Sequence, residues 1–234
     1  MARVRSVDLA SSFLTNLEGA CEVLLVRHGE QVLATNMALA DAVDAPLSEL
    51  GLRQAAAVGA RLSTLNISAV YSSTLQRARD TARAIAESHS LTVSEIEDLG
   101  EINLWRELPQ DKGLLDSLDA AALRAIMQTG NRTQRWDSYP YSEPREQFRR
   151  RVVHAIDAIM RTHVGQRVAV ACHGGVINAY LAHCLESSLD TPCTVHHTSI
   201  TTVRAMDEMR RVVQVNDHTH VRSFQTELNP MNAL

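Results

Sequence analysis

Lysine is almost absent from this sequence. Lys112 is the only one, and every other basic residue apart from histidine is an arginine. A site for phosphate or carboxylate is therefore expected to use the planar guanidinium group, which donates two parallel hydrogen bonds to an anion. The formal net charge is −4, so the surface as a whole does not attract nucleic acid or an anionic membrane. Any anion site must be a local cluster of arginines.

Cysteine pairs and long apolar runs are also lacking. The four cysteines include no CxxC pair and no metal-like spacing, and Cys21 and Cys172 adjoin apolar runs typical of buried strands. This pattern favours a reduced chain over a disulfide scaffold. No apolar stretch is long enough for a signal peptide or a membrane-spanning helix, so we expect a cytoplasmic protein.

The chain does contain enough apolar sequence for one sizeable core. Its 234 residues are 45% hydrophobic, which suits a single α/β domain carrying an insertion. Strand-like and helix-like segments alternate at crossover spacing, which predicts a three-layer α/β/α sandwich around a mainly parallel sheet. Residues 1–20 are expected to form an N-terminal extension with a short helix near 12–17, and residues 103–141 a cap or lid.

Periodicity and capping residues predict the individual elements. Strands are expected at 21–26, 67–71, 91–96, 167–172, 200–206 and 211–215. A helix is expected at 49–63 with Ser48 as its N-cap, and a second helix follows Ser73, which is expected to be its N-cap. Three more helices are expected at 116–128, 144–162 and 177–185. Residues 129–131 are interpreted as a turn, and the last two strands are close enough to pair as a hairpin at one edge of the sheet.

Two of the predicted strands end in a His-Gly dipeptide. One runs into Arg27-His28-Gly29 and the other into His173-Gly174. Side chains just past the carboxyl ends of strands line the ligand crevice of an open α/β sheet, so both imidazoles are expected on one rim. One histidine at a strand end is more often structural, but two such pairs, one beside an arginine, indicate a site.

A metal centre is the main competing interpretation of the paired histidines. Two further pairs exist, His196-His197 and His218-x-His220. Arg27 beside His28 opposes a divalent cation and favours an anion such as phosphate, so we expect no metal and no cofactor. The other histidines are interpreted as surface or hairpin residues. A neutral imidazole can attack phosphorus, and a carboxyl group is the natural proton donor to the leaving alkoxide.

The motif Leu25-Val-Arg-His-Gly-Glu30 resembles the signature of the histidine phosphatase superfamily, also called phosphoglycerate-mutase-like. Further blocks in the family's order are similar, and together they extend from Val23 to Val221. They are Asp44-Ala-Pro-Leu-Ser-Glu-Leu-Gly51, Ser72-Ser-Thr-Leu-Gln-Arg-Ala-Arg-Asp-Thr-Ala82, Leu99-Gly-Glu-Ile102, Ala171-Cys-His-Gly-Gly-Val176 and Val215-Asn-Asp-His-Thr-His220. The resemblance implies a phosphoglycerate-mutase-like fold with a cap insertion.

The resemblance also implies the role of each matched residue. His28 becomes the nucleophile that forms phosphohistidine, and Glu101 the proton donor. Arg27, Arg77 and His173 bind the phosphoryl oxygens, and His173 is counted among the catalytic residues as well. Glu30 and Gly174 are expected to shape the pocket.

The residues alone leave alternatives for two of these roles. Arg79 and Arg83 compete with Arg77, although Arg77 falls in the first turn of its predicted helix, where the positive end of the dipole favours an anion. Glu97 and Asp98 compete with Glu101 as the acid.

Several positions depart from the family pattern. Ala34 stands where many members have a phosphate-contacting asparagine, with Asn36 two residues later. Trp105 is present without the usual glycine-containing turn, and Glu143-Pro144 replaces the common Glu-Ser. The basic, tyrosine-rich cap typical of mutases is not found between residues 101 and 145. These features favour a histidine acid-type phosphatase acting on a small phosphorylated metabolite.

Two alternatives remain open: a phosphoglycerate-mutase-type phosphotransferase, and a non-catalytic phosphate-binding or interaction protein. The expected partner is a small phosphorylated substrate, without nucleic acid or membrane, and a homodimer stays open. The arginine-rich run 145–151 was a candidate nucleic-acid surface. At 100° per residue its four arginines do not share one helix face, so a solvated helix with some ion pairs is the better interpretation.

Overall fold

The computed structural model describes residues 14–15, 17–34 and 37–222. Residues 12, 13 and 16 of the expected short helix near 12–17, and Asn36, lie outside these residues. A six-stranded sheet in the order β3-β2-β4-β1-β5-β6 forms the centre. Its strands are β1 (Cys21–Arg27), β2 (Ala69–Ser72), β3 (Val93–Glu95), β4 (Arg167–Cys172), β5 (Ile200–Met206) and β6 (Met209–Asp217).

Strands β1 to β4 run parallel, whereas β5 is antiparallel to both β1 and β6. The mainly parallel sheet and the β5–β6 hairpin at its edge are therefore confirmed. Seven α-helices surround or extend the sheet in the described part of the chain. They are α2 (Leu39–Val43), α3 (Glu49–Leu62), α4 (Gln76–Glu87), α5 (Leu114–Ser117), α6 (Ala120–Thr133), α7 (Arg145–Thr162) and α8 (Gly174–Cys184).

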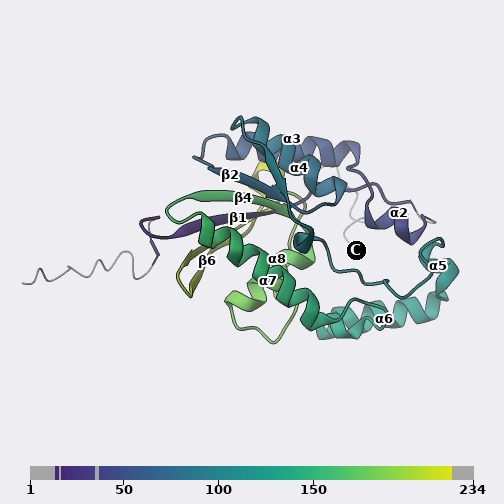
Figure 1. Cartoon of the computed structure of the whole chain (residues 1–234). Helices are drawn as coiled ribbons and strands as arrows, with labels where there is room; N and C mark the ends of the chain where they lie inside the picture. Colours follow the sequence, from purple (N-terminus) through teal and green to yellow (C-terminus); the bar gives the residue numbers. More distant parts are fainter. Residues whose placement is uncertain (1–13, 16, 35–36, 223–234) are drawn as a thin grey trace, which may run out of the picture.

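The central strands are apolar on both faces, and each face is covered by helices (Figure 1). On β1, Leu24 and Val26 pack into one buried cluster with residues of α3 and α4, including Val58 and Ile85. The alternate residues Val23 and Leu25 pack into a second cluster with residues of α7 and α8. Because strand side chains alternate between faces, this division confirms the predicted three-layer α/β/α arrangement.

Three local expectations were wrong. Helix α4 begins at Gln76 after Leu75, so Ser73 is not its N-cap. Helix α8 begins at Gly174, earlier than the predicted 177, and its N-cap residue is His173. Residues 129–131 continue α6 instead of forming a turn. Gly130 is used there for close packing, because a Cβ at this position would lie 2.4 Å from the Tyr139 ring.

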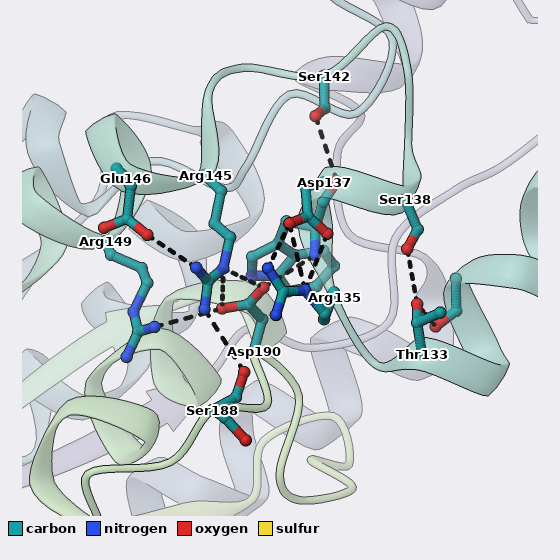
Figure 2. A network of polar contacts seen from close by, with 12 residues as sticks. Thr133, Arg135, Asp137, Ser138, Ser142, Arg145, Glu146, Arg149, Ser188 and Asp190 are labelled. Carbon is teal, nitrogen blue, oxygen red and sulfur yellow. Dashed lines mark hydrogen bonds and ion pairs between the residues drawn. The ribbon is translucent and has the colours of Figure 1, made fainter.

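The segment from Leu99 to α7 forms the excursion that was expected near 103–141, and α5 and α6 lie to one side of the sheet (Figure 1). Its far end is fixed by Asp190, whose side chain is fully buried. Figure 2 shows Asp190 in contact with Arg145 and Arg149. Asp190 accepts hydrogen bonds from the Trp136 amide at 3.0 Å and from Arg145 Nε at 2.6 Å, and it pairs with Arg149 at 3.6 Å. Removing one partner of such a buried pair is strongly destabilising, so this end of the cap is firmly anchored.

The same contacts explain the arginine-rich start of α7. Arg145 and Arg149 both face Asp190, and Arg151 pairs with Glu143 at 2.8 Å. Three of the four arginines of this run are therefore paired with carboxylates of the fold. The four cysteines are free, with Cys21 and Cys172 buried as expected. No helix in the described part of the chain is long and apolar enough to cross a membrane.

Candidate active site

The two predicted imidazoles meet at the carboxyl end of the sheet. Strands β1 and β4 are parallel neighbours with Arg27 opposite Cys172, so the residues that follow, His28 and His173, leave the sheet side by side. Their ring centroids lie 5.1 Å apart at an interplanar angle of 56°. The expectation that both histidines share one rim is confirmed.

The hydrogen bonds of His28 define which nitrogen is free to react. Nδ1 lies 2.7 Å from the carbonyl oxygen of Gly29, so it carries the proton and donates to that oxygen. Arg77 Nε lies 3.2 Å from Nε2 and donates to it. The Nε2 lone pair is thus directed toward a guanidinium, at the place where an anion would be attracted.

His28 is held in its neutral form. Burial lowers the pKa of His28 well below its ordinary value of 6.5, and the charges of His173, Arg77 and Arg27 lower it further. The hydrogen bond to Gly29 opposes this shift only in part. An unprotonated imidazole with a directed lone pair can act as a nucleophile across the physiological pH range.

Arg77 is the arginine that the structure brings to the site. It lies in the first turn of α4 and donates through Nη1 to the carbonyl oxygen of Val43 at 2.6 Å. Its two sequence rivals point elsewhere, because Arg79 pairs with Glu95 at 3.7 Å and Arg83 pairs with Asp80 at 2.5 Å. The first-turn position is confirmed, and Arg77 alone of the three contacts His28.

Arg27 supplies a second guanidinium. Its Nη1 donates to the carbonyl oxygen of Val195 at 2.6 Å, while its buried Nε has no partner among the described residues. His173 is similar: Nε2 bonds the hydroxyl of Ser73 at 2.6 Å, and the buried Nδ1 has no described partner. Buried polar atoms are almost always paired, so these two atoms fit the binding of a polar group such as an oxyanion.

Glu101 is the carboxylate that reaches the site. Its Oε1 accepts from the Ile102 amide at 3.0 Å, and its Oε2 accepts from the Gly175 amide in the first turn of α8, also at 3.0 Å. Its rivals Glu97 and Asp98 are exposed on the preceding turn. Gly175 is needed for this approach, since a Cβ there would lie 2.2 Å from Glu101 Oε1.

The loop after β1 packs closely against the segment Asp44–Gly51. A Cβ on Gly29 would lie 2.5 Å from the Gly51 carbonyl, and one on Gly51 would lie 2.0 Å from the Glu30 carbonyl. The Ser48 hydroxyl caps α3 and donates to Glu30 Oε1 at 2.8 Å. Glu30 therefore shapes the loop without facing the reacting atoms, and Gly174 lies against the Arg27 side chain.

His197 belongs to this site, although it was interpreted as a surface or hairpin residue. Its ring centroid lies 5.6 Å from that of His28. Burial and the nearby Arg27 lower the pKa of His197 to about 3, so its ring is neutral. The orientation of β5 explains the error. An antiparallel neighbour of β1 begins where β1 ends, so the residues before Ile200 return to the His28 rim.

Two other histidines of the predicted pairs, His196 and His218, contact each other. The rings of His196 and His218 stack with centroids 4.3 Å apart, and His196 also contacts the Asn216 side chain. Within the described ranges, no group of three or more histidine, cysteine, aspartate or glutamate residues is arranged to hold a metal ion.

A cavity of about 180 Å³ adjoins the arginine pocket. Arg77 and Glu101 line both, so the cavity opens onto the place where the anion would sit. Its other walls come from α2, from Leu75 just before α4, and from the segment that follows Glu101. Most of these residues are apolar, including Leu39, Val43, Leu75, Ile102, Leu104 and Trp105.

Known proteins resemble this chain in sequence and fold. The chain is 29% identical over 211 residues to a metal-independent phosphoserine phosphatase of Arabidopsis thaliana, covering 86% of this chain and 84% of that protein. It is 30% identical over 161 residues to a probable phosphoglycerate mutase of Yersinia pestis, covering 69% and 73%. The solved structure of YhfR from Bacillus stearothermophilus superposes with a TM-score of 0.71 at 25% identity, covering 86% of this chain and 99% of that one.

A family model provides the broadest match. The model of the histidine phosphatase superfamily (branch 1) matches residues 23–218, a range that contains every site residue described above. The chain belongs to the histidine phosphatase superfamily.

Proposed function

We propose that this protein is a phosphatase that hydrolyses a small phosphorylated metabolite through a phosphohistidine on His28, as a histidine acid-type enzyme. The observation that carries the proposal is the environment of His28. Its Nδ1 is occupied by the Gly29 carbonyl, and Arg77 donates to its Nε2. Nε2 is thus the nitrogen that carries a lone pair, and the guanidinium hydrogen-bonded to it is a cation that can bind the phosphoryl oxygens.

The first half-reaction transfers the phosphoryl group to the protein. The Nε2 lone pair of His28 attacks phosphorus, a P–N bond forms, and the P–O bond to the leaving alcohol breaks. Arg27, Arg77 and His173 bind the phosphoryl oxygens as charge develops there. Glu101 donates a proton to the departing oxygen, which leaves as a neutral alcohol.

The second half-reaction returns the protein to its starting state. The Glu101 carboxylate accepts a proton from water, the water oxygen attacks phosphorus, and the P–N bond breaks. Inorganic phosphate leaves and the electron pair returns to Nε2 of His28. The amides of Ile102 and Gly175 hold the carboxylate in place, so the same group can serve as acid and then as base.

The name of the Arabidopsis relative, a phosphatase that needs no metal, supports hydrolysis, whereas the Yersinia relative supports the mutase alternative. A phosphate-release screen separates them. We expect inorganic phosphate from sugar phosphates, phosphoglycerates, nucleotides, phosphoamino acids or simple alkyl phosphates at some pH between about 4 and 8.

Each other outcome of the screen has a defined meaning. Interconversion of phosphoglycerates without phosphate release would replace the proposal by a mutase. Binding of phosphate without turnover would replace it by a binding protein. His28→Ala should abolish release, and the exposed residue His154 provides a matched His→Ala control that should retain it.

A further inference from the structure

We infer that the protein prefers phosphomonoesters whose alcohol part is apolar and uncharged. The inference rests on the proposed function and concerns the cavity beside the arginine pocket. Because Arg77 and Glu101 line both spaces, this cavity adjoins a phosphoryl group bound to Arg77 and lies where its alcohol part can bind. The walls of the cavity therefore select the leaving group.

The charges of the cavity disfavour an anionic alcohol part. Among the described lining residues, Arg77 is the single cation, and Glu101, the proposed proton donor, is the single acidic residue. Arg77 is engaged by His28 and the Val43 carbonyl and is the group that would bind phosphate. A carboxylate on the substrate would find no second cation among these residues, and a desolvated charge without a partner is costly.

Two polar side-chain atoms of the cavity wall form hydrogen bonds within their own segment. Gln110 Nε2 donates to the carbonyl oxygens of Trp105 and Leu108, at 2.9 and 2.7 Å. Asn103 Oδ1 accepts from the Trp105 amide at 3.2 Å. These bonds shape the wall around Trp105, and they use both hydrogens of Gln110 Nε2, so this nitrogen does not recognise a hydroxyl or carboxylate group of the substrate.

The size of the cavity matches a small apolar group. Its volume of about 180 Å³ exceeds the ~150 Å³ of an apolar cavity known to bind benzene in another protein. Trp105 is partly buried, packs edge-on against Tyr139 with ring centroids 6.2 Å apart, and lines the cavity. Its indole provides the largest apolar surface of this wall, so we assign Trp105 as a specificity-determining residue.

Binding of alkylphosphonates tests the inference without requiring turnover. Calorimetry with methyl-, ethyl-, propyl- and butylphosphonate should show affinity rising about fourfold per methylene. Replacing the terminal methyl of butylphosphonate by a carboxylate should weaken binding at least ~10-fold. Trp105→Gln should flatten the series, whereas Leu115→Gln, an exposed leucine of α5 outside the cavity lining, should leave it unchanged.

A flat series in the unsubstituted protein, or equal or tighter binding of the carboxylate analogue, would overturn the inference, and neither result depends on whether Trp105→Gln folds. A folded Trp105→Gln variant that keeps the full slope would overturn the role of Trp105. Phosphate release from the matching alkyl esters is measured in parallel. If the esters are hydrolysed but phosphonate affinity does not change with chain length, the inference is refuted and the proposed phosphatase function stands. If affinity rises with chain length but no ester is hydrolysed, the inference stands and the phosphatase function is refuted.

Discussion

Gly175→Ala should displace the proposed proton donor, Glu101, while its carboxyl group stays chemically unchanged. The new Cβ would lie 2.2 Å from Glu101 Oε1 and 3.1 Å from Glu101 Cδ. Non-bonded heavy atoms prefer separations of about 3.5 Å or more, so the carboxylate must move by roughly 1 Å. That shift breaks the 3.0 Å hydrogen bond from the Gly175 amide. A misplacement of this size can cost about 10²-fold in rate.

The loss should depend on the leaving group. An alkyl ester needs a proton on its departing oxygen, so its kcat/KM should fall about 10²-fold. Because p-nitrophenolate leaves readily without a proton, the fall on p-nitrophenyl phosphate should stay below about 10-fold. Stability should change little, because the displaced atoms end a flexible side chain and alanine gains up to ~1 kcal/mol over glycine in a helix.

The assay compares kcat/KM for both esters in four proteins: unsubstituted, Gly175→Ala, Glu101→Gln and the double variant. The double variant should lose little more than Glu101→Gln alone, since both changes act on one group. Gly174→Ala is the matched control, because its Cβ would lie at an ordinary 3.6 Å from Arg27 Nε. Equal losses on both esters, or additive losses in the double variant, would refute Glu101 as the proton donor.

Three further predictions follow from the same site. Arg77→Lys removes the guanidinium group that donates hydrogen bonds to both His28 Nε2 and the Val43 carbonyl. Steady-state kinetics should show a fall of about 10²–10³ in kcat/KM, while circular dichroism shows an intact fold. A fall in kcat/KM below about threefold would contradict this role of Arg77. Gly51→Ala forces a Cβ to 2.0 Å from a backbone oxygen, so urea unfolding should show a loss of about 1–3 kcal/mol; unchanged stability would show that this loop contact is not tight. The pKa values of buried His28 and His173 lie well below 6.5 in the folded protein, so only the unfolded chain binds these two protons as the pH falls below 6.5. Each histidine should therefore lower the free energy of unfolding by ~1.4 kcal/mol per pH unit, down to its folded pKa. Urea unfolding at several pH values should show a shallower pH dependence for a His173→Asn variant.

The sequence predicted the elements that carry the chemistry because their signals are local. An apolar run ending in His-Gly marks both β1 and β4, and the first-turn position of Arg77 follows from the start of α4. The family resemblance then selected Glu101 over Glu97 and Asp98. The structure agrees in placing Glu101 on the Gly175 amide, whereas its rivals are exposed.

What the sequence missed depends on contacts between distant segments. His197 reaches the site because β5 runs antiparallel to β1, and no local pattern in the hairpin reveals which strand it joins. Ser73 looked like a helix cap, but its hydroxyl holds His173, a hundred residues away in the chain. Gly130 looked like a turn residue, although the helix continues through it to admit the Tyr139 ring.

The central claim is that His28 carries the phosphoryl group, and trapping the intermediate tests it most directly. The protein would be mixed with a turned-over ester and denatured in base, which preserves phosphohistidine, and the labelled peptide would be sequenced by mass spectrometry. The account predicts one phosphoryl group on Nε2 of His28, because Nδ1 is held by the Gly29 carbonyl, and none in His28→Ala. Continued turnover with no phosphoryl group on His28, or with the label on another residue, would contradict it.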